Sequence, residues 1–406
     1  MRKRVGQIGT LFGFLLIVVF SFAPAKTIAY LPLKDKSLHL LAYAVVAFLM
    51  QLTTGQRGRV VFLAISTLGA LIEVFQPLFG RSFDFFDIVA NCVGALLGVS
   101  LAIVYQKLKE TRVQRGLIER VKTTLMDASI HLEEGLVKQL QWMSSETARK
   151  MEEAPTERAA YEASLEVLAM IQENLRLADV NKMAMCQDTG MVVAFVEIGT
   201  AVPLSMHAIE RAIYQGAEEA IKEGLFRNSV VKEPVFAREN TNTNLPPIIY
   251  WSPSQAKNLK ISLMLKGFGS ENCSALAMLN PTASQEGVIE AVAQIVKEAG
   301  GKPCPPIVVG VGLGGTSERA ALLSKKALLR EVGLPHEEAN YADLEQKIMD
   351  KIQTLKIGPG GFGGPLTALA VAIEYEPTHI AGLPVAVSIS CWADRKGSFI
   401  WEGPYV

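Results

Sequence analysis

The sequence predicts a multi-domain protein in which an N-terminal four-helix transmembrane bundle precedes a mixed α/β domain. Four apolar segments follow one another before residue 105, and predicted strands and helices alternate after residue 190. Glycines cluster at the turns of that second part, and 406 residues leave room for two or three domains. We expect a membrane domain at residues 1–110, a helical connector at 111–180 that begins the next domain, and the main α/β domain at 181–406.

The charge and the cysteines narrow the class of protein. The chain carries 40 acidic and 40 basic side chains, so no basic surface for nucleic acid is expected. Five cysteines at wide spacing do not form the pattern of a disulfide framework. Reduced thiols in a cytosolic compartment are the expectation.

The four apolar segments occupy roughly residues 8–25, 38–54, 60–79 and 85–105. The first and last are near the ~20 residues needed to span a bilayer, whereas polar residues interrupt the middle two. A signal peptide is an alternative for the first, because basic residues precede an apolar run that ends Ala23-Pro24-Ala25. Lysines and arginines at the N-terminus, between spans two and three and after span four favour the cytoplasmic side. We expect a multi-pass cell-membrane protein with residues after 110 in the cytoplasm.

Polar side chains stand in or beside these spans, where burial is costly unless they face the bundle interior. They are Asp35, Lys36, His39, Tyr43, Glu73, Gln76, Arg81, Asp87 and Asn91. One interpretation is a polar network that holds the helices together, and the other is a binding site for a polar lipid or envelope precursor. Together with Gly94 and Gly98, the pattern resembles the VanZ-like family of membrane proteins over most of residues 30–105.

The second half alternates strands and helices. Strands are predicted at Val192–Ile198, Pro247–Trp251, Leu259–Leu265, Ile307–Val311 and Pro384–Ile389, and helices at Ser205–Gly224, Glu286–Ala299 and Ser317–Val332. The run Gly310 to Gly315 fits a dinucleotide-binding pattern, which would need an acidic residue at the end of a second strand. Glu331 instead closes a helical run, so the glycines are expected to pack a strand against a helix or to shape a small anion site.

Three cysteines carry the chemical hypothesis. Cys186 precedes Gln187 and Asp188, Cys304 lies between prolines that stiffen its backbone, and Cys391 precedes Trp392. A metal or cluster site fits these surroundings, with zinc as the alternative, although zinc sites usually use close cysteine pairs that this chain lacks. Cys273 is a fourth candidate. Taken singly, each cysteine could instead be a small packing residue.

Residues from about 116 to the end resemble the alpha subunit of the two-chain class I iron–sulfur fumarate hydratases and of L-tartrate dehydratase. The matching stretches are Cys186–Gly190, Asn240–Pro246, Lys266–Asn272, Cys304–Pro306, Gly314–Thr316, Ile357–Gly364 and His379–Arg395. The resemblance implies an iron–sulfur hydro-lyase fold with a [4Fe–4S] cluster ligated by Cys186, Cys304 and Cys391, leaving one iron open. It implies reversible hydration of a small dicarboxylate, fumarate to malate, with L-tartrate dehydration as the alternative.

The resemblance also implies roles for residues around the cluster. Gln187, Arg227 and Gly269 fall where the family contacts substrate, and an arginine can grip a carboxylate with two hydrogen bonds. Asp188 and His379 are the candidates for moving a proton, while an open iron acts as a Lewis acid. Few other basic residues accompany these motifs, so we expect a separate beta subunit to supply the rest of the active site.

An alternative hypothesis assigns the chain to another functional class. It would be a VanZ-like envelope protein whose cytoplasmic domain senses oxygen or iron through a labile cluster. A sensor needs only the cysteines, so the presence of Gln187, Asp188, Arg227 and His379 favours the enzyme. The expected partners are therefore a small dicarboxylate, a beta subunit and the lipid bilayer, and no nucleic acid.

Overall fold

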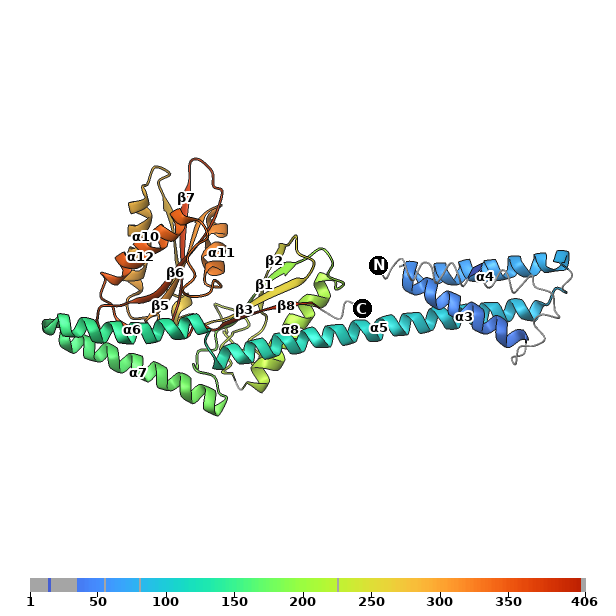
Figure 1. Ribbon diagram of the computed structural model, residues 1–406, viewed down its shortest axis with the longest axis horizontal. Helices are drawn as coiled ribbons and strands as arrows, with labels where there is room; N and C mark the ends of the chain where they lie inside the picture. Colours follow the sequence, from blue (N-terminus) through green and yellow to red (C-terminus); the bar gives the residue numbers. More distant parts are fainter. Residues whose placement is uncertain (1–13, 16–34, 55, 80–81, 225, 403–406) are drawn as a thin grey trace. The chain divides into compact units, whose positions relative to one another are not determined.

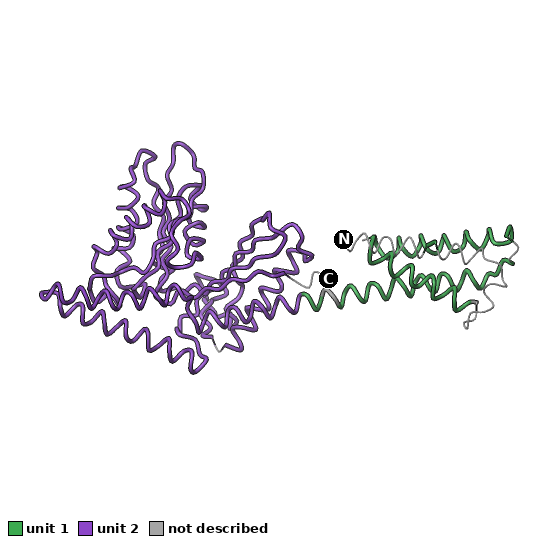
Figure 2. The backbone as a smooth tube through the Cα atoms, viewed as in Figure 1, with its two compact units in different colours: residues 1–113 green, residues 114–406 purple. Residues whose placement is uncertain are grey.

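The computed structural model describes residues 14–15, 35–54, 56–79, 82–224 and 226–402. The chain forms two compact units, Met1–Val113 and Gln114–Val406, which Figure 2 colours separately. The boundary falls inside one continuous helix, α5, which runs from Phe85 to Ile130 (Figure 1). The end of the first unit and the start of the second therefore share one helical backbone.

The described part of the N-terminal unit consists of α3 (Asp35–Thr54), α4 (Gly58–Phe75), a 3-10 turn η1 (Gln76–Phe79) and the first part of α5. Three described helices are long and apolar enough to cross a membrane, over Lys36–Thr54, Gly58–Phe79 and from Phe85 onward. They coincide with the second, third and fourth predicted spans. The first predicted span lies outside the described residues except for Phe14 and Leu15, so the four-helix bundle stays a prediction.

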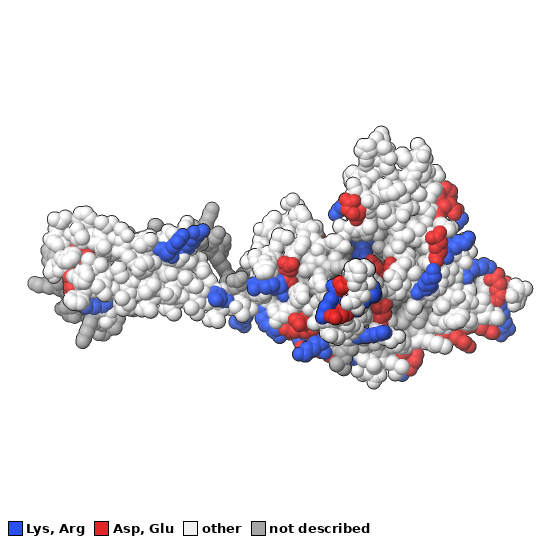
Figure 3. Space-filling view, turned by 180° about the vertical axis from the view of Figure 1, so that it is seen from behind, with Lys and Arg blue, Asp and Glu red and all other residues white. Residues whose placement is uncertain are grey.

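Glycines bring α3 and α5 into close contact. A Cβ at Gly94 would lie 2.3 Å from the carbonyl oxygen of Leu40, and one at Gly98 would lie 2.1 Å from that of Ala44. Large apolar side chains are exposed on the outside of these helices, and Figure 3 shows few charged side chains on the visible face of this unit. Small residues at helix contacts and an apolar outer surface are typical of helices that lie in lipid.

The second unit is built on two four-stranded sheets. The first has the order β2-β1-β3-β8, formed by Ile248–Pro253, Met191–Ile198, Leu259–Lys266 and Lys396–Trp401. The second has the order β4-β7-β5-β6, formed by Ala275–Leu279, Leu383–Ser390, Ile307–Gly314 and Ala368–Glu376. Each sheet mixes parallel and antiparallel neighbours, because β1 pairs parallel with β2 and β5 parallel with β6. The mixed α/β architecture agrees with the prediction.

Helices cover both sheets. The second half of α5 and α8 (Met206–Glu223) pack on the first sheet, with Leu117, Val121 and Ile213 in their common core. In the second sheet, α10 (Gln285–Ala299) and α12 (Ala339–Gln353) lie on one face and α11 (Ser317–Ala327) on the other (Figure 1). The hairpin of α6 (Glu134–Glu153) and α7 (Arg158–Asn181), joined by the turn η2 (Pro155–Glu157), shares a third core with both sheets.

The glycines of the dinucleotide-like run serve packing. A Cβ at Gly310 would lie 2.1 Å from the carbonyl oxygen of Ser324, and one at Gly312 would lie 2.0 Å from that of Ala320. Real Cβ atoms do not approach carbonyl oxygens so closely, so only glycine lets α11 lie against β5 here. The expectation that this run packs a strand against a helix is confirmed. The helix ends at Ala327, earlier than predicted, since the Leu328 and Arg330 carbonyls accept hydrogen bonds from Lys396 Nζ.

The strand registers explain how distant loops meet. In the first sheet Met191 lies opposite Lys266, and Met264 opposite Lys396, so β1 begins where β3 ends and β8 begins. In the second sheet Val308 lies opposite Ser390, so β5 begins where β7 ends. The five residues from Cys391 to Arg395 join these two edges. The loops before β1 and β5 are therefore brought to the same place as the β7–β8 connection.

Candidate functional site

Three free thiols converge at the edge shared by the two sheets. Cys186 precedes β1, Cys304 precedes β5 and Cys391 follows β7. Cys186 and Cys391 pack against one small apolar cluster that contains Met185 and Ala393. The backbone N–H of Trp392 donates a hydrogen bond to the carbonyl oxygen of Cys304, over 3.5 Å. Three loops that are far apart in the chain thus meet at this edge.

The electrostatics of these thiols also show that they are neighbours. Burial is the main cause that raises the pKa of the Cys391 thiol to about 11, and Cys186 and Cys304 act in the same direction. The Arg395 charge and the N–H of Ala393 act in the opposite direction. Burial likewise raises the pKa of Cys304, with Cys186 as the next cause. Thiolates are the form that binds metal, so this site favours them only when a positive charge such as iron lies among them.

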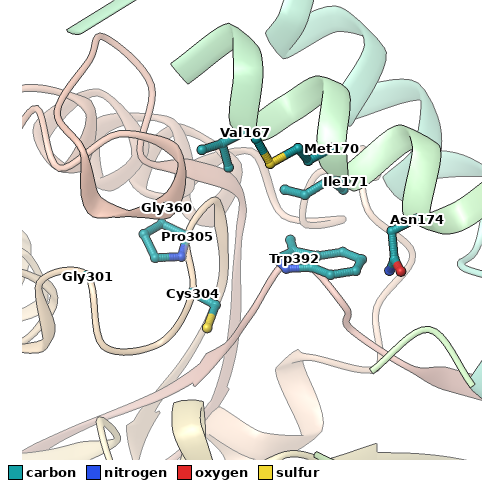
Figure 4. Close-up of a pocket in the computed structure, with 9 residues that line it drawn as sticks. All are labelled: Val167, Met170, Ile171, Asn174, Gly301, Cys304, Pro305, Gly360 and Trp392. Atoms are coloured by element: carbon teal, nitrogen blue, oxygen red, sulfur yellow. The ribbon is translucent and has the colours of Figure 1, made fainter. Parts of the chain in front are cut away.

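The backbone around Cys304 is held in an uncommon conformation. Its φ is +54°, in the left-handed region, which costs an L-residue on the order of 1 kcal/mol. The Gly360 N–H donates to the carbonyl oxygen of Pro305 over 2.8 Å, which fixes the next residue. The turn places Cys304 at the wall of a cavity of about 250 Å³ (Figure 4). Its other lining residues are Val167, Met170, Ile171 and Asn174 of α7 with Gly301, Pro305, Gly360 and Trp392.

The described residues include no group of three His, Cys, Asp or Glu side chains close enough to hold a single metal ion. This finding gives no support to a zinc site in that part of the chain. A cubane cluster does not require such a group, because each cysteine binds a different iron and the sulfurs stay apart. The arrangement of three thiols on three loops therefore fits a [4Fe–4S] cluster.

Asp188 and Gly269, two predicted site residues, lie together. The Gly269 N–H donates a hydrogen bond to Asp188 Oδ2 over 3.1 Å. Gly267 allows this approach, since a Cβ there would lie 2.9 Å from the same oxygen. Gly190, with φ +71°, lies so close to Lys266 that a Cβ would meet its carbonyl oxygen at 2.0 Å. The glycine-rich stretch after β3 thus orients the Asp188 carboxylate. Gln187, which lies between Cys186 and Asp188 in the chain, is exposed.

Arg227 lies on the loop after α8 and is exposed. Its carbonyl oxygen accepts a hydrogen bond from Asn244 Nδ2 over 2.8 Å, while Asn244 Oδ1 accepts from the N–H groups of Ser229 and Val230. Asn244 is close to the first strand pair, because Val193 of β1 lies opposite Ile248 of β2. The Asn240–Pro246 stretch therefore holds the Arg227 loop at the edge that carries Cys186. Within the described part of the chain, no ion pair engages the Arg227 guanidinium.

The structure does not bring His379 to the thiols of its own chain. His379 lies on the exposed loop between β6 and β7, where its Nδ1 accepts a hydrogen bond from the Ala381 N–H. Strand β7 then crosses the sheet before Cys391, and eight residues at ~3.3 Å each separate the two by roughly 25 Å. Proximity in sequence is misleading here, because an extended strand carries the chain to the opposite edge. A proton-moving role for His379 stays a prediction and cannot be exercised at the thiols of the same chain.

Two buried cations beside the thiols, Lys266 and Arg395, were not identified as site residues from the sequence. Lys266 is 2% exposed, donates to Ser270 Oγ over 2.9 Å and pairs with Glu271 over 3.3 Å. Burial lowers the pKa of Lys266, and Glu271 opposes this effect. Arg395, also 2% exposed, donates from Nη2 to the carbonyl oxygen of Asp188. Both residues lie inside stretches singled out above, and only their burial distinguishes them from ordinary surface charges.

Comparison with known proteins gives a consistent result. A family model described as fumarate hydratase (Fumerase) matches residues 118–400. The chain is 41% identical over 262 residues to a putative L(+)-tartrate dehydratase subunit alpha of Methanocaldococcus jannaschii, covering 63% of this chain and 90% of that protein. It is 33% identical over 231 residues to the L(+)-tartrate dehydratase subunit alpha of Escherichia coli O157:H7, covering 56% and 76%. The family match lies within the second unit, so the VanZ-like resemblance of the first stays a prediction.

Proposed function

The chain belongs to the fumarate hydratase family, and from this we propose that it is the alpha subunit of a two-chain hydro-lyase acting on a small dicarboxylate at a [4Fe–4S] cluster. The observation that carries the proposal is the meeting of Cys186, Cys304 and Cys391 at one edge of two sheets. These residues would hold three irons of the cluster. When bound, the cluster supplies a Lewis acid at its fourth iron, which polarises the C–OH bond of the substrate.

The residues of this chain are proposed to bind the substrate and to orient the group that moves a proton. Arg227 presents an exposed guanidinium to one substrate carboxylate, and a planar guanidinium matches two carboxylate oxygens. Asp188 is fixed through its carboxylate by the Gly269 N–H and through its carbonyl oxygen by Arg395. Its second oxygen, Oδ1, is left to accept or deliver a proton beside the cysteines. Gln187, exposed in the same loop, is the candidate for a hydrogen bond to the substrate.

The charge of the site supports a second chain. A dicarboxylate carries negative charge at both ends, and Lys266 and Arg395 are buried rather than exposed to a substrate. Arg227 is thus the one predicted substrate-binding cation of this site, and it can neutralise only one carboxylate. The relatives named above are described as alpha subunits, which implies a beta partner. We infer that the beta chain supplies the missing cation.

Two substrates fit this proposal. The family description favours fumarate, hydrated to malate, whereas the names of the two relatives favour dehydration of L-tartrate. Both reactions break or form a C–O bond next to a carboxylate, so the same thiols, Asp188 and Arg227 serve either one. The contact that discriminates between them is expected on the beta chain.

We further propose that the N-terminal unit anchors the enzyme in the cell membrane as a multi-pass bundle, with the second unit in the cytoplasm. Its described helices have the required length and composition. His39 Nδ1 lies 3.0 Å from Asn91 Oδ1, and Lys36 pairs with Asp84 over 3.2 Å. These contacts support a polar network between helices, and a VanZ-like role in binding a polar lipid remains part of the proposal. Recovery of the full chain in carbonate-washed membranes tests the anchor, and its recovery in the soluble fraction would contradict it.

Co-expression tests the enzymatic proposal. The full chain is purified in detergent under anaerobic conditions, with and without a candidate beta chain, and assayed for fumarate hydration and L-tartrate dehydration. We expect activity on at least one substrate with both chains present and little with either chain alone. An Arg227→Met variant should raise KM more than it lowers kcat, because it removes a contact made to the substrate in the ground state. Absence of both activities in a cluster-loaded pair of chains would contradict the proposal.

A further inference from the structure

We propose that Arg395 is a positioning residue for the iron–sulfur centre, whose buried guanidinium offsets the negative charge of the cluster, donates its Nε–H to a cluster sulfur and holds the Asp188 loop through Nη2. The inference rests on the proposed function, because it assigns a partner to Arg395 only if the three cysteines carry a cluster. It adds a residue that the predicted cluster ligands and substrate-binding residues do not include.

The burial of Arg395 without a counter-charge is the first observation. The residue is 2% exposed, yet no ion pair of its guanidinium occurs among the residues that the structure describes. Its Nε–H is buried and has no hydrogen-bond acceptor. A charged group taken out of water is costly unless it is paired, and buried donors without acceptors are rare. An anion with acceptor atoms is therefore expected next to Arg395.

The other buried cations of the same region differ in this respect. Lys396, the next residue, pairs with Asp394 over 3.0 Å and Glu133 over 3.1 Å, and it donates to two carbonyl oxygens. Lys266 pairs with Glu271 over 3.3 Å. The fold thus supplies carboxylates for its buried lysines and none for Arg395. This contrast makes a missing counter-ion a specific property of Arg395 rather than of the region.

The position of Arg395 identifies the anion. Its positive charge acts on the thiol of Cys391, four residues earlier in the chain. Its backbone carbonyl accepts a hydrogen bond from the Leu265 N–H over 2.9 Å, which fixes it beside the end of β3. A Cβ on Gly267 would lie 3.4 Å from Nη2 and 2.9 Å from Asp188 Oδ2, so the guanidinium and the carboxylate flank this glycine. Arg395 is the last residue of the Cys391–Arg395 connection, and its side chain therefore reaches from this connection to the Asp188 loop.

A cubane core bound by three thiolates carries net negative charge and exposes sulfurs that accept hydrogen bonds. It supplies both things that Arg395 lacks, a counter-charge and an acceptor for Nε–H. Hydrogen bonds to cluster sulfurs and nearby charge are the means by which proteins set the properties of such centres. Because Nη2 also binds the Asp188 carbonyl oxygen, loading of the cluster and placement of Asp188 are coupled through one side chain.

The test compares cluster properties, not activity alone, in the anaerobically reconstituted full chain. Arg395→Met removes the charge and the donors, and Arg395→Lys keeps a charge but lacks the Nε–H. Lys396→Met is the matched control, because it removes an adjacent buried cation that already has carboxylate partners. The readouts are the reduction potential of the cluster, followed by electron paramagnetic resonance, and the rate of iron transfer to a chelator. Thermal melting of each apoprotein reports the fold.

We expect Arg395→Met to lower the reduction potential, since loss of a positive charge disfavours the reduced cluster, and to weaken iron retention by roughly 10- to 100-fold. Arg395→Lys should keep most of the potential but release iron faster than the parent. Lys396→Met should lower the melting temperature and shift the potential less than Arg395→Met, because Asp394 or Glu133 takes up a proton when it loses its cation. A parent-like potential and parent-like iron release in Arg395→Met would overturn the inference while leaving the cluster in place. If Arg395→Met does not fold, parent-like iron release in Arg395→Lys overturns it equally.

A parent chain that takes up no iron under these conditions would overturn the proposed cluster, and this inference with it. That result differs from the previous one, in which the parent holds a cluster and the variants match it. The two failures are therefore told apart by the iron content of the parent.

Discussion

Replacing Asn244 with alanine should loosen the loop that presents Arg227. Asn244 is fully buried and makes three hydrogen bonds to that loop. Its Oδ1 accepts from the Ser229 N–H over 2.6 Å and the Val230 N–H over 3.1 Å, and its Nδ2 donates to the Arg227 carbonyl oxygen over 2.8 Å. The residue also has φ +53°, which asparagine tolerates better than alanine.

The magnitude follows from these contacts. A net hydrogen bond contributes about 1 kcal/mol, and the three partners lie near the surface, where water can replace part of each loss. The left-handed backbone adds roughly 1 kcal/mol for alanine. Asn244→Ala should therefore destabilise the second unit by about 3 kcal/mol. Because Arg227 is no longer held, KM for the dicarboxylate should rise with a smaller change in kcat.

Thermal or urea unfolding of the purified chain measures the first effect, and steady-state kinetics of the two-chain enzyme measure the second. Asn244→Gly is the matched control, since glycine adopts φ +53° at no steric cost and loses only the side-chain hydrogen bonds. It should be less destabilised than Asn244→Ala and should raise KM to a similar extent. A melting temperature and KM equal to those of the parent in Asn244→Ala would refute the assignment of this residue.

Three further predictions follow from separate parts of the second unit. Gly312→Ala should lower stability by about 1–3 kcal/mol, because the new methyl group would lie 2.0 Å from the Ala320 carbonyl oxygen, whereas Gly382→Ala at an open position should be neutral in the same melting assay. His379→Ala should leave the iron content and the electron paramagnetic resonance signal of the chain unchanged, since the residue lies at the far edge of the sheet; loss of the cluster would contradict the fold description. Hydrogen bonds to Asp179 and Asp127 raise the pKa of His131, so this contact stabilises the fold below the ordinary histidine pKa and is lost as pH rises through the raised value. His131→Gln should therefore lower the melting temperature more at pH 6 than at pH 9, and an equal effect at both pH values would count against the ion pairs.

The strands that the sequence predicted are those with continuous apolar runs. Strands β1, β3, β5 and β7 are mostly buried, and apart from Glu197 in β1 and Lys260 and Lys266 in β3 their residues are apolar or small. Strand β4 was missed because it is short and largely exposed, and β8 because it begins with Lys396 and Gly397. Strand β6 was missed because its alanine-rich sequence has no strong preference for a strand. Burial on both faces made four of the five predicted strands visible in the sequence, whereas β2 (Ile248–Pro253), which is half-buried to exposed, was visible from its β-branched and aromatic residues.

The site residues also divide into those that could be predicted from the sequence and those that only the fold shows. The meeting of Cys186, Cys304 and Cys391 could be expected from the resemblance, and the strand registers give its physical reason. Lys266 and Arg395 could not be identified as site residues, because a charged side chain in a sequence is most often exposed and only the packed fold shows it buried. His379 was grouped with the cysteines because the resemblance implies an active-site histidine at this position, although a whole strand separates it from Cys391 in space.

The central claim, that three distant cysteines hold one cluster, is tested most directly by iron and acid-labile sulfide analysis of single cysteine variants reconstituted without oxygen. The parent chain should hold one [4Fe–4S] cluster, and Cys186→Ser, Cys304→Ser and Cys391→Ser should each lose most of its iron. Cys273→Ser should keep the full cluster, because the Cys273 thiol already donates to the Gly269 carbonyl oxygen over 3.5 Å and has no assigned role as a ligand. Full iron content in any of the three variants, or its loss in Cys273→Ser, would contradict the account.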